Sequence, residues 1–90
     1  MKYTYNAIIE NKDNKYYARI NELPGCITTG KTYEDAINQI TDAASIYLIV
    51  TEDENHEIPK SNIQILSDAE EKGVSAIISV DTDAYRKSSL

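Results

Sequence analysis

Apolar and polar side chains alternate in the first ten residues of the chain. The apolar members recur at every second position: Tyr3, Tyr5, Ala7 and Ile9. A period of two places these side chains on one face, which is typical of a half-buried β-strand. Ile8 interrupts the alternation. We therefore expect the second face of this strand to be partly covered as well.

A second strand follows the polar cluster at residues 11–15, which suits a hairpin loop. We expect this strand over residues 16–21. Its alternation puts two small or aliphatic side chains on one face and two larger ones on the other: Ala18 and Ile20 against Tyr17 and Arg19. The first two strands therefore form an antiparallel hairpin.

Pro24 and Gly25 interrupt the chain after this hairpin. Proline removes a hydrogen-bond donor and glycine admits a positive φ, so a turn is expected here. Residues 26–29 then form a short third strand that ends before Gly30. Together the three strands predict an antiparallel meander.

An amphipathic helix begins after Gly30. Thr32 is the expected N-cap, and Asp35 three residues later gives an arrangement similar to a capping box. The apolar positions trace one helical stripe: Ile37, Ile40, Ala44, Tyr47 and Leu48. We expect the helix to reach about Glu52 and to cover the sheet.

The last third of the chain contains a break at Pro59 and one clear strand at residues 75–81. Between them, residues 67–73 could form one or two helical turns that end at Gly73. The nearly continuous apolar character of the last strand favours an interior position, covered on both faces. A long connection carrying a helix can return this strand parallel to the first one, beside it. The predicted class is α+β, in the order β-β-β-α-(short helix)-β.

Charge and length narrow the possible functions. The 90 residues suffice for one domain with one core. Fifteen acidic and nine basic residues give a formal net charge of −6. This balance argues against an autonomous nucleic-acid binder, which normally carries a basic surface for phosphate. It favours a basic protein partner.

Residues that could carry chemistry are few. A single cysteine, Cys26, excludes an internal disulfide, and neither a zinc-binding motif nor any sign of a cofactor occurs. His56 lies in a polar loop without an orienting partner, and Cys26 is expected to be buried. A metal-dependent nuclease would need convergent carboxylates, but Asp81 and Asp83 lack a third partner in the sequence. We therefore expect a protein that is not an enzyme.

The longest uninterrupted apolar run, residues 46–50, is far shorter than a membrane span, and the N-terminus lacks the apolar segment of a signal peptide. These features predict a cytoplasmic protein without a membrane partner.

Two pairs of residues are candidates for contact with another protein. Tyr17 and Arg19 share an open sheet face, and aromatic and arginine side chains are common at protein interfaces. An aromatic sheet could instead stack single-stranded RNA bases, but nearby basic residues are scarce. Ile46 and Ile49 point away from the helical stripe and would form an apolar patch. Alternatively, the chain after Pro59 covers them with three apolar residues: Ile63, Ile65 and Leu66.

One segment resembles a known family. Tyrosine-rich residues 16–17 precede the string Glu22-Leu23-Pro24-Gly25-Cys26, a short strand, Gly30 and a helix opening Thr32-Tyr33-Glu34-Asp35-Ala36. This arrangement resembles the N-terminal domain of HicB-type antitoxins, and the likeness covers about residues 3–85. It implies a partial ribonuclease H-like fold: the three-stranded meander, a fourth strand beside the first, and one long helix on the sheet.

The resemblance also implies a function. HicB-type proteins bind HicA toxins, small basic ribonucleases that cleave messenger RNA, and cover their catalytic surface. We therefore expect an antitoxin-like inhibitor of a HicA-like toxin. We also expect a homodimer or higher homo-oligomer, because most small soluble oligomers have twofold symmetry. The alternative is a stand-alone, homo-oligomeric HicB-like binding module without a cognate toxin.

Many members of that family continue into a helix-turn-helix or ribbon-helix-helix segment that binds DNA. This chain stops at Leu90 with only a short basic trace, Arg86-Lys87. We expect one HicB-like domain over residues 1–90, without a C-terminal DNA-binding domain and without DNA binding. The chain is either a stand-alone member or a segment of a longer one.

Overall fold

The computed structural model describes residues 1–60 and 74–88. In chain order, these residues form β1 (Lys2–Lys12), β2 (Lys15–Arg19), β3 (Ile27–Gly30), α1 (Tyr33–Asp53), β4 (Val74–Asp81) and α2 (Thr82–Ser88). The predicted α+β class and the β-β-β-α-β order are confirmed. Two expectations lie outside the described residues: the helical turns at residues 67–73, and the covering role suggested for Ile63, Ile65 and Leu66.

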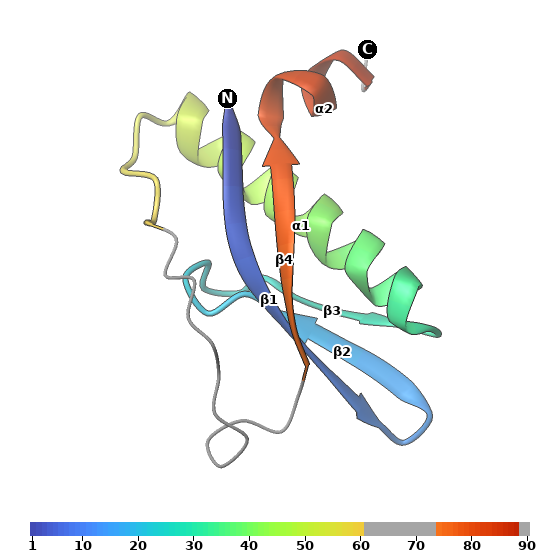
Figure 1. Cartoon of the computed structure of the whole chain (residues 1–90). Coiled ribbons are helices and arrows are strands. Elements are labelled where there is room, and N and C mark those ends of the chain that lie inside the picture. The colour runs from blue at the N-terminus through green and yellow to red at the C-terminus, as the bar shows by residue number, and fades with distance from the viewer. Residues whose placement is uncertain (61–73, 89–90) are drawn as a thin grey trace.

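The four strands form one sheet in the order β3-β2-β1-β4 (Figure 1). β1 therefore lies in the interior and pairs with both β2 and β4. Register places Ile9 opposite Ala18 of β2, and Ala7 opposite Ala76 of β4. The expected meander and the placement of the fourth strand beside the first are confirmed.

The direction of β4 differs from the expectation. β4 runs antiparallel to β1, with Val74 opposite Ile9 and Asp81 opposite Lys2. α1 ends near the start of β1, where the Tyr3 hydroxyl reaches Glu52. A strand that followed the helix directly would start there and run parallel to β1. The connection instead brings the chain to the other end of β1 before β4 begins, so the strand direction is reversed.

The expectation that β4 is an interior strand covered on both faces is also wrong. Among the described residues β4 pairs only with β1, so it lies at an edge of the sheet. Ile78 and Val80 are buried under α1, whereas Ser75, Ile77 and Ser79 are exposed on the opposite face. The nearly continuous apolar run predicted that Ile77 is buried like its neighbours, yet the Ile77 side chain is 63% exposed.

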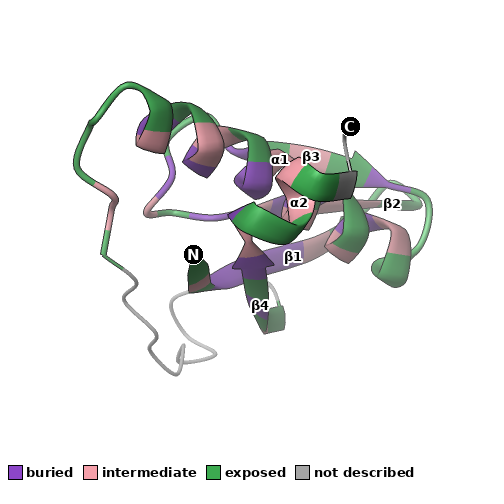
Figure 2. Cartoon of the chain, turned by 90° about the horizontal axis from the view of Figure 1, so that it is seen from above, coloured by how far each residue is buried: buried purple, intermediate pink, exposed green. Residues whose placement is uncertain are grey.

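The core lies between α1 and one face of the sheet (Figure 2). Its sheet side is supplied by every second residue of the strands, and its helix side by the predicted stripe. The fully buried members on α1 are Ala36, Ile40, Ala44 and Leu48. Ile8 is buried although it lies on the sheet face opposite α1. This agrees with the expected partial cover of that face.

Local contacts fix the start of α1. The backbone N–H of Asp35 donates a hydrogen bond of 3.0 Å to the Thr32 hydroxyl, so the predicted N-cap is confirmed. Gly30 ends β3 directly against the first turn of the helix. A Cβ atom on Gly30 would lie only 2.5 Å from the Ala36 backbone nitrogen. Only glycine allows this close approach between strand and helix.

α2 was not predicted. It begins directly after β4, where Oδ1 of Asp81 accepts hydrogen bonds from the backbone N–H groups of Asp83 and Ala84. An aspartate that accepts such bonds caps a helix N-terminus. On α2, Tyr85 donates a hydrogen bond of 2.8 Å to Asp42, which attaches this short helix to α1.

Candidate protein-binding surface

The last turns of α1 carry an apolar and acidic surface. We call it the helix-end surface and define it by Ile46, Tyr47, Val50, Glu54, His56 and Glu57. Ile46 and Val50 lie four residues apart and therefore on the same side of the helix. Each of these two side chains is 48% exposed. They form a short apolar stripe on the exposed side of the helix.

A hollow of about 360 Å³ lies at the C-terminal end of this stripe. Its lining combines an apolar floor with an acidic rim: Tyr47, Val50, Thr51, Glu54, His56 and Glu57. Long basic side chains commonly lay their aliphatic stems on apolar surface and place the charged head at a carboxylate. The hollow therefore has the chemistry to receive a lysine or arginine of another protein.

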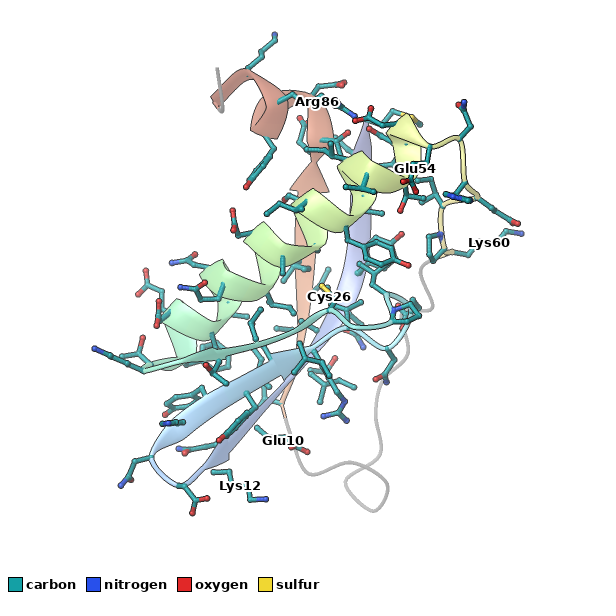
Figure 3. The ribbon with its side chains drawn as sticks, turned by 180° about the vertical axis from the view of Figure 1, so that it is seen from behind. Glu10, Lys12, Cys26, Glu54, Lys60 and Arg86 are labelled. Atoms are coloured by element: carbon teal, nitrogen blue, oxygen red, sulfur yellow. The ribbon has the colours of Figure 1, made fainter. Side chains whose placement is uncertain are left out.

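Electrostatics strengthen the negative character of this end of the helix. The last turn of α1 contains Glu52 and Asp53 but no basic residue. Carboxylates at a helix C-terminus oppose the helix dipole, which is already negative there. Arg86 of α2 compensates part of this charge, since its Nη2 lies 2.8 Å from Asp53 and 3.3 Å from Glu52 (Figure 3).

Glu54 and Glu57 extend the negative charge beyond the helix. His56 Nε2 lies 3.3 Å from a Glu54 carboxylate oxygen, and both side chains are largely exposed. The guanidinium of Arg86 is engaged by Glu52 and Asp53. Arg86 therefore compensates Glu52 and Asp53, while Glu54 and Glu57 leave the hollow beside Val50 negative.

Glu52 has a different role from its neighbours. Its Oε2 accepts hydrogen bonds from the Tyr3 hydroxyl at 2.6 Å and from the Thr82 hydroxyl at 3.1 Å. The bond from Tyr3 is the main reason that the pKa of Glu52 is lowered. The same bond raises the pKa of Tyr3 to about 12. Glu52 therefore joins α1 to β1 and α2 and belongs to the structure of the domain.

A second surface lies on the face of the sheet away from α1. We call it the outer sheet face and define it by Glu10, Tyr17, Arg19 and Ile27. These residues line a hollow of about 370 Å³ together with Lys12, Asp13 and Ala18. Arg19 lies 3.6 Å from Glu10 and donates a hydrogen bond to Asn21. The outer sheet face therefore carries both positive and negative side chains, and some of them pair with each other within the chain.

The four residues proposed from the sequence fall on these two surfaces. Tyr17 and Arg19 share the outer sheet face as predicted, and both are half-buried. Ile46 lies outside the core stripe, as predicted, and is exposed. Ile49 is half-buried toward α2, where Arg86 donates a hydrogen bond to its backbone carbonyl. Their contact with a partner stays a prediction.

The sequence reasoning missed Val50. Its spacing of four residues from Ile46 was the available signal, because residues i and i+4 share a helix face. The sequence places His56 in a polar loop, and its pattern alone does not link the acidic residues around it to Val50. Their position beside Val50 depends on how the chain turns after α1, at Asn55, which has a φ of 57°.

The residues considered for catalysis are buried or form contacts within the domain. Cys26 is 5% exposed, and burial raises the pKa of its thiol. Asp81 caps α2, and Asp83 accepts a hydrogen bond of 2.7 Å from the amino group of Met1. Within residues 1–60 and 74–88, no three His, Cys, Asp or Glu side chains form a group that could hold a metal ion.

None of the helices in the described ranges has the length and apolar character needed to cross a membrane.

Comparison with protein families gives a match over most of the chain. The model of the HicB-like antitoxin of bacterial toxin-antitoxin systems matches residues 5–89. A UPF0150 protein of Helicobacter pylori is 44% identical over 43 residues, which are 48% of this chain and 60% of that protein. A UPF0150 protein of Thermoplasma acidophilum is 36% identical over 64 residues, or 71% of this chain and 91% of that protein.

Solved structures show the same fold. The N-terminal domain of the Burkholderia pseudomallei antitoxin HicB superposes with a TM-score of 0.75 at 18% identity, covering 88% of this chain and 99% of that one. A chain of a toxin-antitoxin complex from Streptococcus pneumoniae gives a TM-score of 0.79 at 21% identity, covering 94% of this chain and 73% of that one. At such low identity these likenesses establish the arrangement of strands and helices.

Proposed function

Since this chain belongs to the family of HicB-like antitoxins of bacterial toxin-antitoxin systems, we propose that it binds and neutralises a small basic ribonuclease of the HicA type. It does so by covering the catalytic surface of that enzyme. The chain itself performs no chemistry in this proposal. Its formal net charge of −6 favours rapid encounter with a basic protein.

The observation that carries this proposal is the helix-end surface. A ribonuclease that binds RNA presents lysine and arginine side chains to phosphate. The hollow beside Val50 offers such side chains an apolar floor and the carboxylates of Glu54 and Glu57. An inhibitor that occupies the RNA-binding cations in this way would exclude the substrate from the same cations.

The placement of Glu54 against the helix dipole favours a functional role for its carboxylate, since Glu54 is the C-cap of α1. An acidic residue at a helix C-terminus costs roughly 0.3–1 kcal/mol when it is exposed. Departures from local stability rules are most often found at functional sites. A cationic partner would remove this cost on binding, so the surface is more stable in the complex than alone.

The outer sheet face is the second contact that we propose, with Tyr17 and Arg19 as its centre. Its carboxylate Glu10 is already paired with Arg19, at 3.6 Å, and Lys12 lines the same hollow. This face therefore contributes less electrostatic attraction to a basic toxin than the helix-end surface does.

Purification and titration of a complex test the proposal. The chain is co-expressed with the short basic reading frame beside its gene, and the complex is purified. Binding is then measured by calorimetry at low and at physiological salt. We expect a stable mixed complex, weaker binding at higher salt, and loss of the partner's ribonuclease activity on complex formation. Absence of a complex with that partner would contradict neutralisation.

A matched pair of double variants locates the contact. Glu54→Gln with Glu57→Gln removes two charges from the helix-end surface, and Glu34→Gln with Asp35→Asn removes two charges from the first turn of α1, at the opposite end of the helix. Each pair changes the formal net charge from −6 to −4. Charged hydrogen bonds contribute roughly 1.5–3 kcal/mol each, so we expect the first pair to weaken binding tenfold or more. Equal loss in the control pair would refute this contact.

A further inference from the structure

No strand within residues 1–60 and 74–88 pairs with the outer edge of β4. Among the described residues β4 pairs with β1 alone, so one row of its backbone groups faces outward. Proteins usually guard such edges with lysine, proline, a bulge or a very short strand. Residues 74–80 contain neither a charged residue nor a proline, and they pair with β1 in continuous register from Val74 to Asp81.

The opposite edge of the sheet differs. β3 has only four residues, and it is followed at once by Lys31 and preceded by Pro24. β4 is twice as long, with eight residues. The sheet therefore has one guarded edge and one long neutral edge.

Apolar side chains accompany the neutral edge. Ile77 is 63% exposed at the middle of β4, and Val74 is 57% exposed at its start. Ser75 and Ser79 flank Ile77 on the same face of the strand and are exposed as well. Burial of an exposed isoleucine removes apolar surface from water and is favourable. The edge thus offers both hydrogen-bonding groups and an apolar centre.

The sequence of β4 is nearly symmetric about Ile77. Residues 74–80 read Val-Ser-Ala-Ile-Ile-Ser-Val. Reversal about Ile77 matches valine with valine at both ends and serine with serine inside them. The remaining pair joins Ala76 with Ile78, a small residue with a large one. When two identical strands pair antiparallel about a twofold axis, each residue lies opposite the residue at the reversed position. A sequence that is symmetric on reversal therefore sets like residues opposite each other.

We propose that β4 pairs antiparallel with β4 of a second copy of this chain, about a twofold axis at Ile77. Ile77 then meets Ile77 of the second copy, and Ser75 lies opposite Ser79 on the same face. Val74 of one copy lies opposite Val80 of the other. The two sheets join into one continuous sheet of eight strands. Twofold symmetry closes the assembly at two chains, because the β4 edges of both copies pair with each other and no free β4 edge is left to bind a third copy.

A second copy fits this edge better than a basic partner does. The strand itself is uncharged over residues 74–80, so it offers no carboxylate to a cationic surface. The remainder of each copy carries a formal net charge of −6, so the two copies repel each other at low salt. Higher salt screens this repulsion and should strengthen pairing. Toxin binding has the opposite salt dependence, so the failure of one proposal can be told from the failure of the other.

Light scattering after size exclusion tests the proposal on the full chain alone. We expect the mass of two chains, with a dimer fraction that increases with salt. Ile77→Lys places two like charges at the axis and is expected to give a single chain. Ile27→Lys is the matched control, because Ile27 is 65% exposed on the guarded edge strand β3. Circular dichroism confirms that both variants are folded.

A monomeric wild type would overturn the proposal, as would a dimer that Ile77→Lys leaves intact or that Ile27→Lys disrupts equally. Loss of toxin binding in Ile77→Lys without a change in the mass of the free chain would assign the edge to the toxin, and would also overturn it.

Disulfide trapping tests the register independently of solubility. In a background where Cys26→Ser removes the native thiol, Ile77→Cys places two thiols opposite each other across the axis. Opposed residues in antiparallel strands have Cα atoms about 4.5–5.5 Å apart, within the range of a disulfide. Mild oxidation should crosslink Ile77→Cys at least about tenfold faster than Ile27→Cys. Equal rates for the two variants would refute pairing at this axis.

Discussion

The hydroxyl of Tyr3 donates a hydrogen bond of 2.6 Å to Glu52, 49 residues later in the chain. This contact joins the first strand to the last turn of the long helix. Thr82 and Arg86 of α2 reach the same carboxylate, so β1 and α2 converge on one side chain of α1. The contact therefore links the core of the domain to the acidic end of α1.

Replacement of this hydroxyl should weaken the fold at neutral pH. Tyr3→Phe keeps the ring and removes the hydrogen bond to a charged acceptor. We expect a loss of about 1–2 kcal/mol in the free energy of unfolding, measured with urea. Tyr33→Phe is the control, because Tyr33 is exposed and contacts Tyr16 through its ring. If Tyr33→Phe lowers the free energy of unfolding as much as Tyr3→Phe does, the hydrogen bond to Glu52 does not account for the loss.

The same contact predicts a change of stability at alkaline pH. The pKa of Tyr3 is about 12 in the folded chain, against an ordinary value of 10.0, because the bond to Glu52 favours the protonated phenol. A raised pKa stabilises the fold below the unfolded value, and this contribution disappears as the pH rises from 10 toward 12. The wild type should therefore lose more stability than Tyr3→Phe over this range. Parallel urea curves for the two proteins would contradict the assignment.

Gly30 should tolerate no side chain. In Gly30→Ala the new Cβ would lie 2.5 Å from the nitrogen and 2.8 Å from the Cα of Ala36, so either β3 or α1 must move. We expect a loss of about 2 kcal/mol or more, visible as a lower thermal midpoint. Gly25→Ala is an informative comparison. It has a φ of 82° and open space around its Cα, so only the cost of the left-handed conformation, about 1 kcal/mol, applies. A smaller loss for Gly30→Ala than for Gly25→Ala would refute the steric argument.

Cys26 should react slowly with thiol reagents in the folded chain. Its side chain is 5% exposed, and burial raises the pKa of the thiol, so both access and the thiolate fraction are reduced. We expect modification by a chromogenic disulfide to be at least about tenfold slower in buffer than in urea. Rapid modification of the native chain would place Cys26 in a reactive environment and reopen a chemical role for it.

Apolar contact on the two candidate surfaces can be compared directly. Ile46→Ala with Val50→Ala removes the stripe of the helix-end surface, while Tyr17→Ala with Arg19→Ala removes the centre of the outer sheet face. We expect the first pair to weaken toxin binding about tenfold or more and the second pair to weaken it less. Calorimetry on the purified complexes measures both. The reverse order would move the main contact to the sheet.

The sequence allowed the local part of the fold to be predicted. The alternation in β1, the N-cap at Thr32 and the stripe on α1 each depend on residues close together in the chain. The direction and edge position of β4 depend on where a long connection brings the chain, which local patterns do not encode. α2 could have been found, because Asp81 followed by Asp83 two residues later is a recognisable helix start.

The candidate surface was only partly visible before the fold was known. Ile46 could be placed outside the core stripe by helical spacing alone. Ile49 could not be separated from Val50 in this way, because α2 was unforeseen and its Arg86 lies against that side of α1. The acidic residues after Glu52 become part of the candidate surface because the chain turns after α1 and brings Glu57 beside Val50 and Tyr47.

The central position of β1 also sets the order in which the domain can fold. β1, β2, β3 and α1 are consecutive, and their contacts can form as the chain is made. The second neighbour of β1 is β4, where Lys2 meets Asp81 across nearly the whole length of the chain. Pairing at such sequence separation closes a long loop and is slow compared with local contacts. Until it forms, the outer edge of β1 is open, and the last strand of the chain completes the sheet that its first strand began.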